Sequence, residues 1–331
     1  MNTFGNFFRI SVFGESHGES VGVTIDGCPA GLPLTVEDFL PDLERRRGGT
    51  QKGTTPRKED DLPVFKSGVF NGHTTGAPVT IQFANNNTRS TDYEKLRAVP
   101  RPGHADWVAT EKYGGYEDYR GGGHFSGRLT LAQVAAGVVA KKLLSGIEIT
   151  GTITEIAGEK DLEKGLQKGI DAKDSVGGIV ECVVKGIPVG LGEPFWDSAE
   201  SLISHAVFAI PAIRGIEFGT GFQAASMFGS EHNDAIEDAS GKTTTNHAGG
   251  IVGGITNGND IVFRVAVKPT SSTPKEQFTF NRETGRQELF AVRGRHDLCI
   301  ALRVPVVLEA VTAIVLCDLM MQQQLIQRIW K

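Results

Sequence analysis

The segment from Val304 to Met321 constrains the fold of this chain more than any other, because it is the most apolar stretch of the sequence. Glu309 and Asp318 interrupt it, so we expect it to fall short of a membrane span. The region 306–328 instead predicts a long C-terminal helix with a buried centre. The segment 130–144 is apolar on nearly every side and predicts a second buried helix. A chain of 331 residues can bury the sizeable core that such helices require.

Glycine makes up 42 of the 331 residues, nearly twice the average share of about 7%. The glycines follow no three-residue period and 39% of residues are apolar, which excludes collagen and intrinsic disorder. This excess suits tight turns and backbone that lies against a ligand. Lys and Arg number 34 against 39 Asp and Glu, and the net charge of −5 argues against a nucleic-acid partner.

The N-terminus and the cysteines indicate the compartment. Residues 1–9 contain no basic segment followed by an apolar core, so no signal peptide is visible. The four cysteines are widely spaced and form no CxxC pair: Cys28, Cys182, Cys299 and Cys317. We therefore expect reduced, mostly buried thiols in a cytoplasmic protein, without a membrane partner or a bound metal. A zinc site at the cysteines is the open alternative.

Hydrophobic periodicity predicts strands at 9–13, 21–25 and 176–188, a hairpin or strand pair at 69–84, and further strands within 249–268. Helices are expected at 35–47, 130–144, 200–210 and 306–328. Pro41 lies inside the first helix and predicts a kink or a late start, whereas Thr130 and Gln133 have the spacing of a capping box. Strands and helices alternate without the period of βαβ units, which favours the α+β class.

One internal similarity indicates a duplication within a single domain spanning 1–331. Residues 68–88 align without gaps on residues 250–270 and are identical at six of 21 positions. The segment DGCPAGL at 26–32 resembles KGIPVGL at 185–191, in the same order along the chain. We hypothesise two repeated halves with a boundary near residue 150. Chance matching of glycine-rich turns is the alternative.

Gly14–Gly18 reads GESHG and fits the G-x-S-x-G nucleophile elbow of serine hydrolases. The elbow requires a following helix, but residues 19–26 predict a strand, so the motif fails its own structural context. What remains is a turn that presents Ser16 and His17. A histidine in such a turn is either catalytic or simply solvated.

Several further motifs carry arginine, glycine or histidine. Arg45–Arg47 closes a helix, and three consecutive arginines cannot all face one way, so at least one could face a pocket instead of only stabilising the helix end. Lys52, Arg57 and Lys58 follow and make this region a local basic patch. Three consecutive glycines follow Arg120, and Arg128 comes soon after them at the start of a helix, a pattern that suits anion binding. His104 precedes Asp106 by two residues in a rigid turn, an arrangement that could orient an imidazole for proton transfer.

The C-terminal half adds three more segments. Asn246–Gly250 and Lys268–Ser272 are small polar turns that could hold a phosphate or a flavin edge, or could be ordinary turns. Asp297, beside Arg295 and His296, is either a structural ion-pair partner or a tuned base. Three acid or base candidates and many arginines indicate a site for a highly anionic small molecule, but they do not name the reaction.

Taken together, these segments resemble the chorismate synthase family over essentially the whole chain. The resemblance rests on motifs in order: GESHGESVGVTIDGCP at 14–29, RPGHAD at 101–106, DYRGGG at 118–123, the run 123–139 with Ser126-Gly127-Arg128, NHAGG at 246–250, KPTSS at 268–272, and RHD at 295–297 followed by Glu309-Ala310-Val311. It implies a lyase that eliminates phosphate from 5-enolpyruvylshikimate 3-phosphate to give chorismate, in a trans-1,4 elimination. The family requires reduced FMN without net redox change.

The family also implies the wider properties of this chain. Its fold is an α+β sandwich of helices between antiparallel sheets, and its usual assembly is a homotetramer. An external flavin reductase is the expected partner, because the sequence contains no dinucleotide fingerprint, and NADPH as a direct reductant stays open. If NADP is bound, Arg46 and Lys52 are the implied contacts.

The resemblance assigns roles residue by residue. His17 would protonate the reduced flavin or steady its charge, His104 would assist proton handling near the leaving phosphate, and Asp297 would help to accept a proton through flavin N5. The implied substrate-binding residues are Ser16, Arg46, Arg57, Arg128 and Arg295. The implied FMN-binding residues are His124, Phe125, Ser126, Pro211, Ala212, Gly253, Lys268, Pro269, Thr270, Ser271, Ser272 and Arg295.

The sequence also departs from the family pattern. Six positions differ: Gly48 replaces Pro, Lys52 replaces Arg, His124 and Phe125 replace a basic and a small residue, Leu129 replaces an acid, and Leu298 replaces Pro. None of these changes removes a proposed acid, base or key arginine, although they alter details of the flavin contact. Two other hypotheses stay open, a serine hydrolase acting through Ser16 and a non-catalytic module that binds an anion or a flavin.

Overall fold

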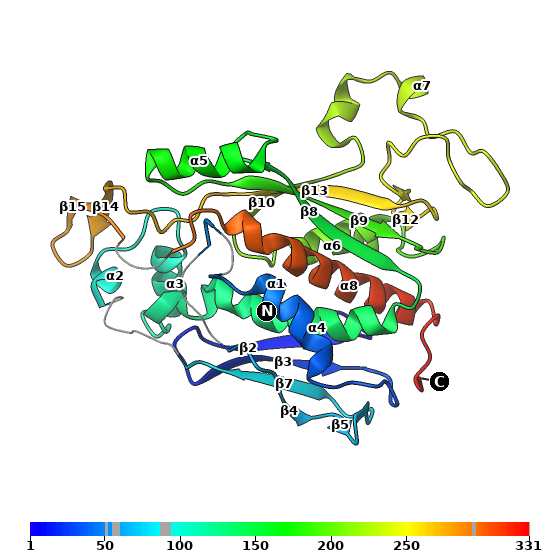
Figure 1. The fold of residues 1–331 in the computed structure, drawn as a ribbon, viewed down its shortest axis with the longest axis horizontal. Coiled ribbons are helices and arrows are strands. Elements are labelled where there is room, and N and C mark those ends of the chain that lie inside the picture. Colours follow the sequence, from blue (N-terminus) through cyan, green and yellow to red (C-terminus); the bar gives the residue numbers. More distant parts are fainter. Residues whose placement is uncertain (50–51, 55–59, 87–93, 293–295, 331) are drawn as a thin grey trace.

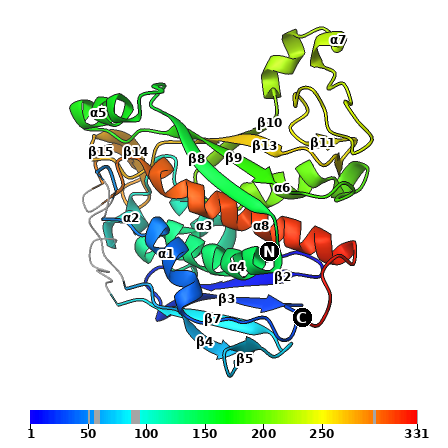
Figure 2. The ribbon, with the colours of Figure 1, turned by 45° about the vertical axis from the view of Figure 1, so that its right-hand side comes forward.

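A layer of helices lies between two antiparallel sheets in the computed structural model of the chain (Figure 1). The structure describes residues 1–49, 52–54, 60–86, 94–292 and 296–330. A second view shows both sheets packed against this layer (Figure 2). The N-terminal residues belong to the first sheet, and Ile329 near the C-terminus pairs with Ala30, which follows a strand of the same sheet. Mixed helices and antiparallel strands confirm the expected α+β class.

The first sheet has five strands, in the spatial order β1 (Thr3–Phe4), β2 (Arg9–Gly14), β3 (Ser20–Asp26), β7 (Val79–Ala84) and β4 (Val64–Ser67). Strands β2 and β3 form a hairpin whose last pair is Gly14 and Val21. The side chains of Val21, Val23 and Ile25 alternate toward the core and are fully buried. This alternation explains why the sequence predicted both strands correctly.

The second sheet has four strands, in the order β10 (Ile213–Phe218), β13 (Ile261–Val267), β9 (Gly178–Lys185) and β8 (Glu148–Ile156). Strand β13 pairs with β9 from Ile261–Val184 to Val267–Gly178. Strands β9 and β13 agree with the sequence prediction, whereas β8 and β10 were not predicted. Both of these are edge strands whose residues are mostly half-exposed, so their hydrophobic period is weak.

Four helices occupy the central layer: α1 (Leu40–Arg46), α4 (Thr130–Leu143), α6 (Ala199–Val207) and α8 (Val304–Gln322). Helices α4 and α8 pack closely on each other because small residues meet at their crossing. A Cβ atom added at Gly137 would lie 2.3 Å from the Cβ atom of Ala310. Nearly every residue of both helices is buried, as their all-round apolar sequence predicted.

The helical segment 300–322 is long and apolar enough to cross a membrane, judged by length and composition alone. The sequence expectation that Glu309 and Asp318 make it too polar for a membrane span is therefore not met. In the structure, 78% of its most apolar window is buried inside the fold. The two carboxylates have specific partners. Glu309 accepts hydrogen bonds from Arg45, Lys141 and the backbone of Gly151, and Asp318 accepts from the backbone N–H groups of Asn6, Phe7 and Phe8.

Shorter elements surround this frame. The remaining helices are α2 (Glu94–Ala98), α3 (Asp106–Tyr113), α5 (Leu162–Ala172) and α7 (Gly229–His232). The remaining strands form the hairpins β5 (Val69–Phe70) with β6 (His73–Thr74), β11 (Ile251–Val252) with β12 (Ile255–Thr256), and β14 (Gln277–Asn281) with β15 (Arg286–Phe290). Short 3₁₀ segments are η1 (Glu37–Phe39), η3 (Arg120–Phe125), η4 (Gly127–Leu129), η5 (Phe195–Asp197), η6 (Gly221–Ser226) and η7 (Ile300–Arg303).

Several predicted boundaries need correction. The helix expected at 35–47 begins as η1, and its α-helical part starts only at Leu40, so Pro41 causes a late start. The C-terminal helix ends at Gln322, before the predicted residue 328. The capping box at Thr130 is wrong, because its hydroxyl donates to the carbonyl of Gly127 and the residue lies inside the helix. All four cysteines are buried and free, as expected.

The two sheets share an order of elements. The first reads β2-β3-β7-β4 beyond its edge strand β1, and the second reads β8-β9-β13-β10. The hairpin β5–β6 precedes β7 as β11–β12 precedes β13, and these are the segments whose sequences align. Strand β8 begins at Glu148, beside the predicted boundary near 150. The duplication itself stays a prediction, which superposition of the two halves would test.

The α4–α8 crossing gives a first prediction. Gly137→Ala adds a methyl group where Ala310 leaves no room, so we expect a loss of about 1–3 kcal/mol in the free energy of unfolding. Gly229→Ala is the control, because a Cβ atom there meets nothing within 4 Å. Denaturant unfolding of both variants measures the effect. Equal stability of the two variants would contradict a tight crossing.

Glu309 gives a second prediction. Burial alone would raise the pKa of this carboxyl, but Arg45 and Lys141 outweigh burial and hold the pKa below its ordinary value. A folded-state pKa below the unfolded value of about 4.3 stabilises the protein above that pH, and the stability is lost as the pH falls through the folded pKa.

Glu309→Gln therefore lowers stability at neutral pH and flattens its decline between about pH 5 and about pH 3. Thermal unfolding across this range is the measurement, with the exposed Glu163→Gln as the control. A decline as steep as that of the parent chain would show that Glu309 does not contribute.

Candidate active site

A cavity of about 560 Å³ opens at the end of the helical layer where α4 and α8 both begin. Segments that are distant in sequence converge on it from both halves of the chain. Its wall includes the β2–β3 turn, the end of α1, the loop before α3, the glycine run before α4, the segment after α6, the segment after β13 and the start of α8. Residues from all these segments line the cavity, among them Ser16, Arg46, Asp61, Arg101, His104, Gly121, Phe125, Ser126, Arg128, Lys268, Asp297 and Arg303.

The β2–β3 turn places Ser16 and His17 against the glycine run. Both side chains are buried, and the N–H of Ser16 donates to the carbonyl of Gly123 over 3.1 Å. A Cβ atom at Gly121 would lie 2.4 Å from Cδ2 of His17. The glycine run is therefore required for close approach to the turn. Because Gly14–Gly18 joins two hairpin strands, the nucleophile-elbow geometry of a serine hydrolase is absent from this described turn.

The loop before α3 builds a histidine–carboxylate pair. Nδ1 of His104 lies 2.6 Å from an oxygen of Asp106, as the sequence spacing suggested. Arg101 donates to both oxygens of the same carboxylate over 2.8 Å, and also to the hydroxyl of Ser272. Burial would raise the pKa of Asp106, but the hydrogen bonds from Arg101 and His104 hold it well below its ordinary value. Asp106 is thus a fixed anion that orients the imidazole.

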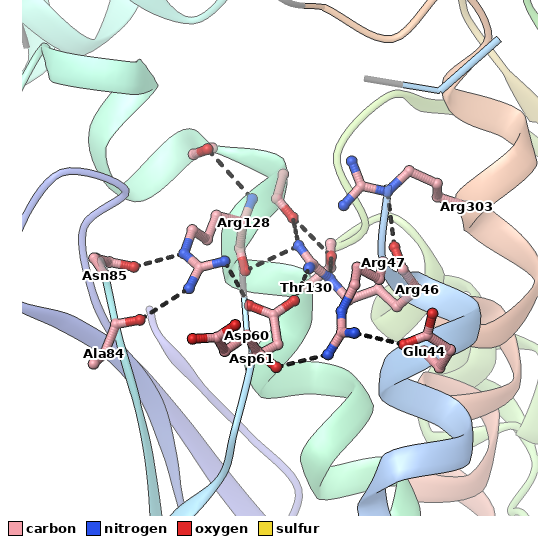
Figure 3. Close-up of polar contacts among 12 residues, drawn as sticks. Glu44, Arg46, Arg47, Asp60, Asp61, Ala84, Asn85, Arg128, Thr130 and Arg303 are labelled. Atoms are coloured by element: carbon pink, nitrogen blue, oxygen red, sulfur yellow. Dashed lines mark hydrogen bonds and ion pairs between the residues drawn. The ribbon is translucent and has the colours of Figure 1, made fainter. Parts of the chain in front are cut away.

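Arg46 and Arg128 form the basic wall of the cavity (Figure 3). Arg46 closes α1 and is almost completely buried, so one residue of the arginine run does face the pocket. Burial, followed by the charges of Arg303 and Arg128, lowers the pKa of Arg46 to about 9. The guanidinium remains charged at neutral pH, but its charge is destabilised, and an anion in the cavity would relieve that cost.

Asp61 lies between these two arginines. One carboxylate oxygen accepts from Nη1 of Arg128 over 2.9 Å, and the other pairs with Nη1 of Arg46 over 3.4 Å. No sequence pattern predicted Asp61 as a site residue, because its partners are 15 and 67 positions away along the chain.

Arg303 connects Asp297 to Arg46. Its Nη1 donates to Asp297 over 3.2 Å, and its Nε donates to the backbone carbonyl of Arg46 over 2.8 Å. Arg303 and Asp297 line the cavity together with His296. Arg303 also was not predicted, although it directly precedes the apolar helix α8. Asp297 is therefore an ion-pair partner, as one of the two sequence interpretations proposed. It also lies at the cavity wall, where the other interpretation, a catalytic base, requires it to be.

The opposite wall contains hydroxyls, one lysine and apolar side chains. Lys268 donates to the hydroxyl of Ser271 over 2.8 Å, and burial together with Arg214 lowers the pKa of Lys268. The predicted flavin residues His124, Phe125, Ser126, Pro211, Ala212, Lys268, Thr270, Ser271 and Ser272 all line the cavity. Although His124 belongs to the cavity wall, the nitrogens of its ring contact the carbonyl of Gly14 and the side chain of Asn2.

Four further predicted residues are outside the cavity wall. His17 lies behind Gly121, Pro269 is adjacent to the wall in sequence, Gly253 belongs to the turn of the β11–β12 hairpin, and Lys52 contacts Gln167. Arg57 and Arg295 lie outside the residues that the structure describes. Among the described residues, no cluster of His, Cys, Asp or Glu has the arrangement of a metal site.

Comparison with known proteins identifies the family. The family model described as chorismate synthase matches residues 8–321. The chain is 73% identical to a chorismate synthase of Chitinophaga pinensis, over 100% of each chain. The chain belongs to the chorismate synthase family. A chorismate synthase of Dehalococcoides mccartyi is 44% identical, over 100% of this chain and 99% of the relative.

A crystal structure of chorismate synthase has the same fold, with a TM-score of 0.73 at 26% identity, covering 97% of this chain and 93% of that chain. The family's activity is that of a carbon–oxygen lyase, which forms chorismate by eliminating phosphate from 5-enolpyruvylshikimate 3-phosphate. The resemblance inferred from the sequence motifs is confirmed. The serine-hydrolase and non-catalytic hypotheses are not supported.

Gly121 gives a prediction for this site. Gly121→Ala would press its methyl group into the imidazole of His17, so we expect chorismate formation to fall by about tenfold or more, since small displacements of catalytic groups are costly. Gly115→Ala is the matched control, because Gly115 has a similar positive φ but open space around its Cβ position. Equal activity of the two variants would show that contact with His17 is unimportant.

Proposed function

We propose that this cavity binds 5-enolpyruvylshikimate 3-phosphate together with reduced FMN and catalyses the trans-1,4 elimination of phosphate without net redox change. The observation that carries the proposal is the convergence of buried arginines, a histidine–carboxylate pair and Asp297 on one cavity. A substrate with two carboxylates and one phosphate requires several cationic donors, and guanidinium groups suit such oxyanions best.

The cavity suits a flavin as well as an anionic substrate. Its volume of about 560 Å³ lies within the usual range of about 300–1,000 Å³ for ligand sites. Phe125, Ile300 and Val304 supply apolar surface for a flat ring, whereas Lys268 and neighbouring hydroxyls supply donors for polar edges and a phosphate. When bound, reduced FMN supplies transient electron density that assists departure of the phosphate.

The side chains around the cavity divide the remaining tasks. Arg46 and Arg128 bind the anionic groups of the substrate, and we assign Ser16, Arg57 and Arg295 to the same task from the family resemblance. His104, oriented by Asp106, handles a proton near the leaving phosphate. Asp297, held by Arg303, takes part in removing the substrate proton. His17 is a further acid–base group beside the glycine run.

The assembly and the reductant complete the proposal. We expect a homotetramer from the family resemblance, and large apolar side chains exposed on the described surface could contribute to its contacts, among them Phe195, Trp196, Phe222 and Phe228. Gly253, in the β11–β12 turn, Pro269 and Arg295 are proposed as flavin contacts only from the resemblance. We also propose a cytoplasmic enzyme that has no membrane or nucleic-acid partner and depends on an external flavin reductase. We also propose that the sandwich of helices and sheets arose from two repeated halves with a boundary near residue 150.

An anaerobic assay tests the reaction and the reductant together. We expect chorismate from 5-enolpyruvylshikimate 3-phosphate and pre-reduced FMN, and none with oxidised FMN and NADPH as the sole reductant. Turnover without any flavin would refute the proposed mechanism. Turnover with NADPH alone would instead assign the reductase activity to this chain, with Arg46 and Lys52 as candidate NADP contacts.

Two substitutions test the assigned residues. We expect His17→Ala and Asp297→Asn each to lower kcat by about 10²–10⁴-fold, the usual size of an acid–base contribution, while reduced FMN still binds. Flavin fluorescence titration measures binding, and stopped-flow absorbance measures chorismate formation. Near-normal turnover in both variants would remove these residues from the mechanism.

A further inference from the structure

Asp61 presents an unusual feature for an anion-binding cavity, because it places a carboxylate in the wall. Its side chain is only 2% exposed, and Asp61, Arg46 and Arg128 all line the cavity. A carboxylate at this place repels an incoming carboxylate or phosphate unless it is itself neutralised by the arginines. Figure 3 shows it between the two guanidinium groups.

The other two nitrogens of each guanidinium group also have partners within the protein. Arg46 donates through Nε to Thr130, and through Nη2 to the carbonyls of Gly127 and Arg128. Arg128 donates through Nε to Asn85 and through Nη2 to the carbonyl of Ala84. In both residues, Nη1 is the nitrogen that reaches Asp61. A ligand anion that approaches these Nη1 groups meets the carboxylate of Asp61 on the same two nitrogens, so the two anions compete for the same positive charge.

Asp61 also has an uncommon backbone conformation. Its φ of 50° is in the left-handed region, which is uncommon outside glycine, although Asp and Asn enter it more readily than other residues. The preceding carbonyl, that of Asp60, accepts a hydrogen bond from Nη2 of Arg47. An unfavourable backbone conformation persists where surrounding contacts enforce it. Here these contacts are the ion pairs with Arg46 and Arg128 and the tie to Arg47.

We infer that Asp61 is an internal counter-anion, which occupies the Nη1 donors of Arg46 and Arg128 and thereby limits how tightly the cavity binds carboxylates and phosphates. An arriving anion then exchanges one ion pair for another. Because phosphate is a product of the reaction, this exchange keeps product affinity low and favours release. The inference rests on the proposed function, in that it takes this cavity to be the anion site, and it assigns Asp61 as a residue that tunes affinity.

Inorganic phosphate is the probe that tests this role. Asp61→Asn keeps the shape of the side chain and removes its charge, so the full chain should bind phosphate about tenfold more tightly, equivalent to one charged hydrogen bond set free. Asp60→Asn is the matched control, since it removes the same charge from an adjacent exposed side chain. Isothermal titration calorimetry measures the affinity, and the control should match the parent chain.

Thermal unfolding separates this role from a merely structural one. Asp61→Asn should unfold at a lower temperature than the parent without phosphate, and phosphate should raise its Tm more than it raises that of the parent. A structural role alone predicts the lower Tm without the larger rise. Phosphate affinity equal to or weaker than that of the parent chain would overturn the inference.

A second pair of variants covers the case in which Asp61→Asn does not fold. The double variant Asp61→Asn/Arg128→Gln removes one charge of each sign and should bind phosphate more tightly than Arg128→Gln alone, whereas equal affinity overturns the inference. The anaerobic assay on the parent chain is independent of this comparison. Chorismate formation with unchanged phosphate affinity in the variant refutes the counter-anion only, whereas lack of chorismate formation refutes the proposed function.

Discussion

The burial of positive charge is the constraint on which the rest of this structure depends. A guanidinium group can be taken out of water only when its donors are satisfied and its charge is offset. Here Arg101 is paired with Asp106, Arg303 with Asp297, and Arg46 and Arg128 share Asp61. The loops around the cavity are arranged to supply these carboxylates and the carbonyls beside them. The result is a site that is cationic in function while the chain as a whole is acidic.

The frame of the fold could be read from the sequence because its signal is local. Helices α4 and α8 are apolar all round, and strands β3 and β13 alternate regularly, so each could be recognised from its own residues. Strands β8 and β10 lie at sheet edges and are half-exposed, which weakens the alternation. The β14–β15 hairpin was missed because most residues of both strands are exposed, so their hydrophobic alternation is weak.

The candidate site also contains contacts that the sequence could predict and contacts that it could not. His104 and Asp106 are two residues apart in one turn, so their pairing followed from the sequence. Asp61 and Arg303 depend on partners from other elements, and their importance appears only when the chain is folded. The motifs pointed to the reaction class through resemblance, whereas the charge balance of the pocket required the three-dimensional arrangement.

The close crossing of α4 and α8 also sets a distance within the active site. Arg128 lies just before α4 and Arg303 directly before α8, so the relative position of the helices sets the spacing of these two arginines. One helical turn corresponds to about 5.4 Å along the axis, far more than a hydrogen bond tolerates. By allowing one register only, Gly137 and Ala310 fix a distance in the active site from deep inside the core. Residues that never touch a ligand therefore share in defining which ligand fits.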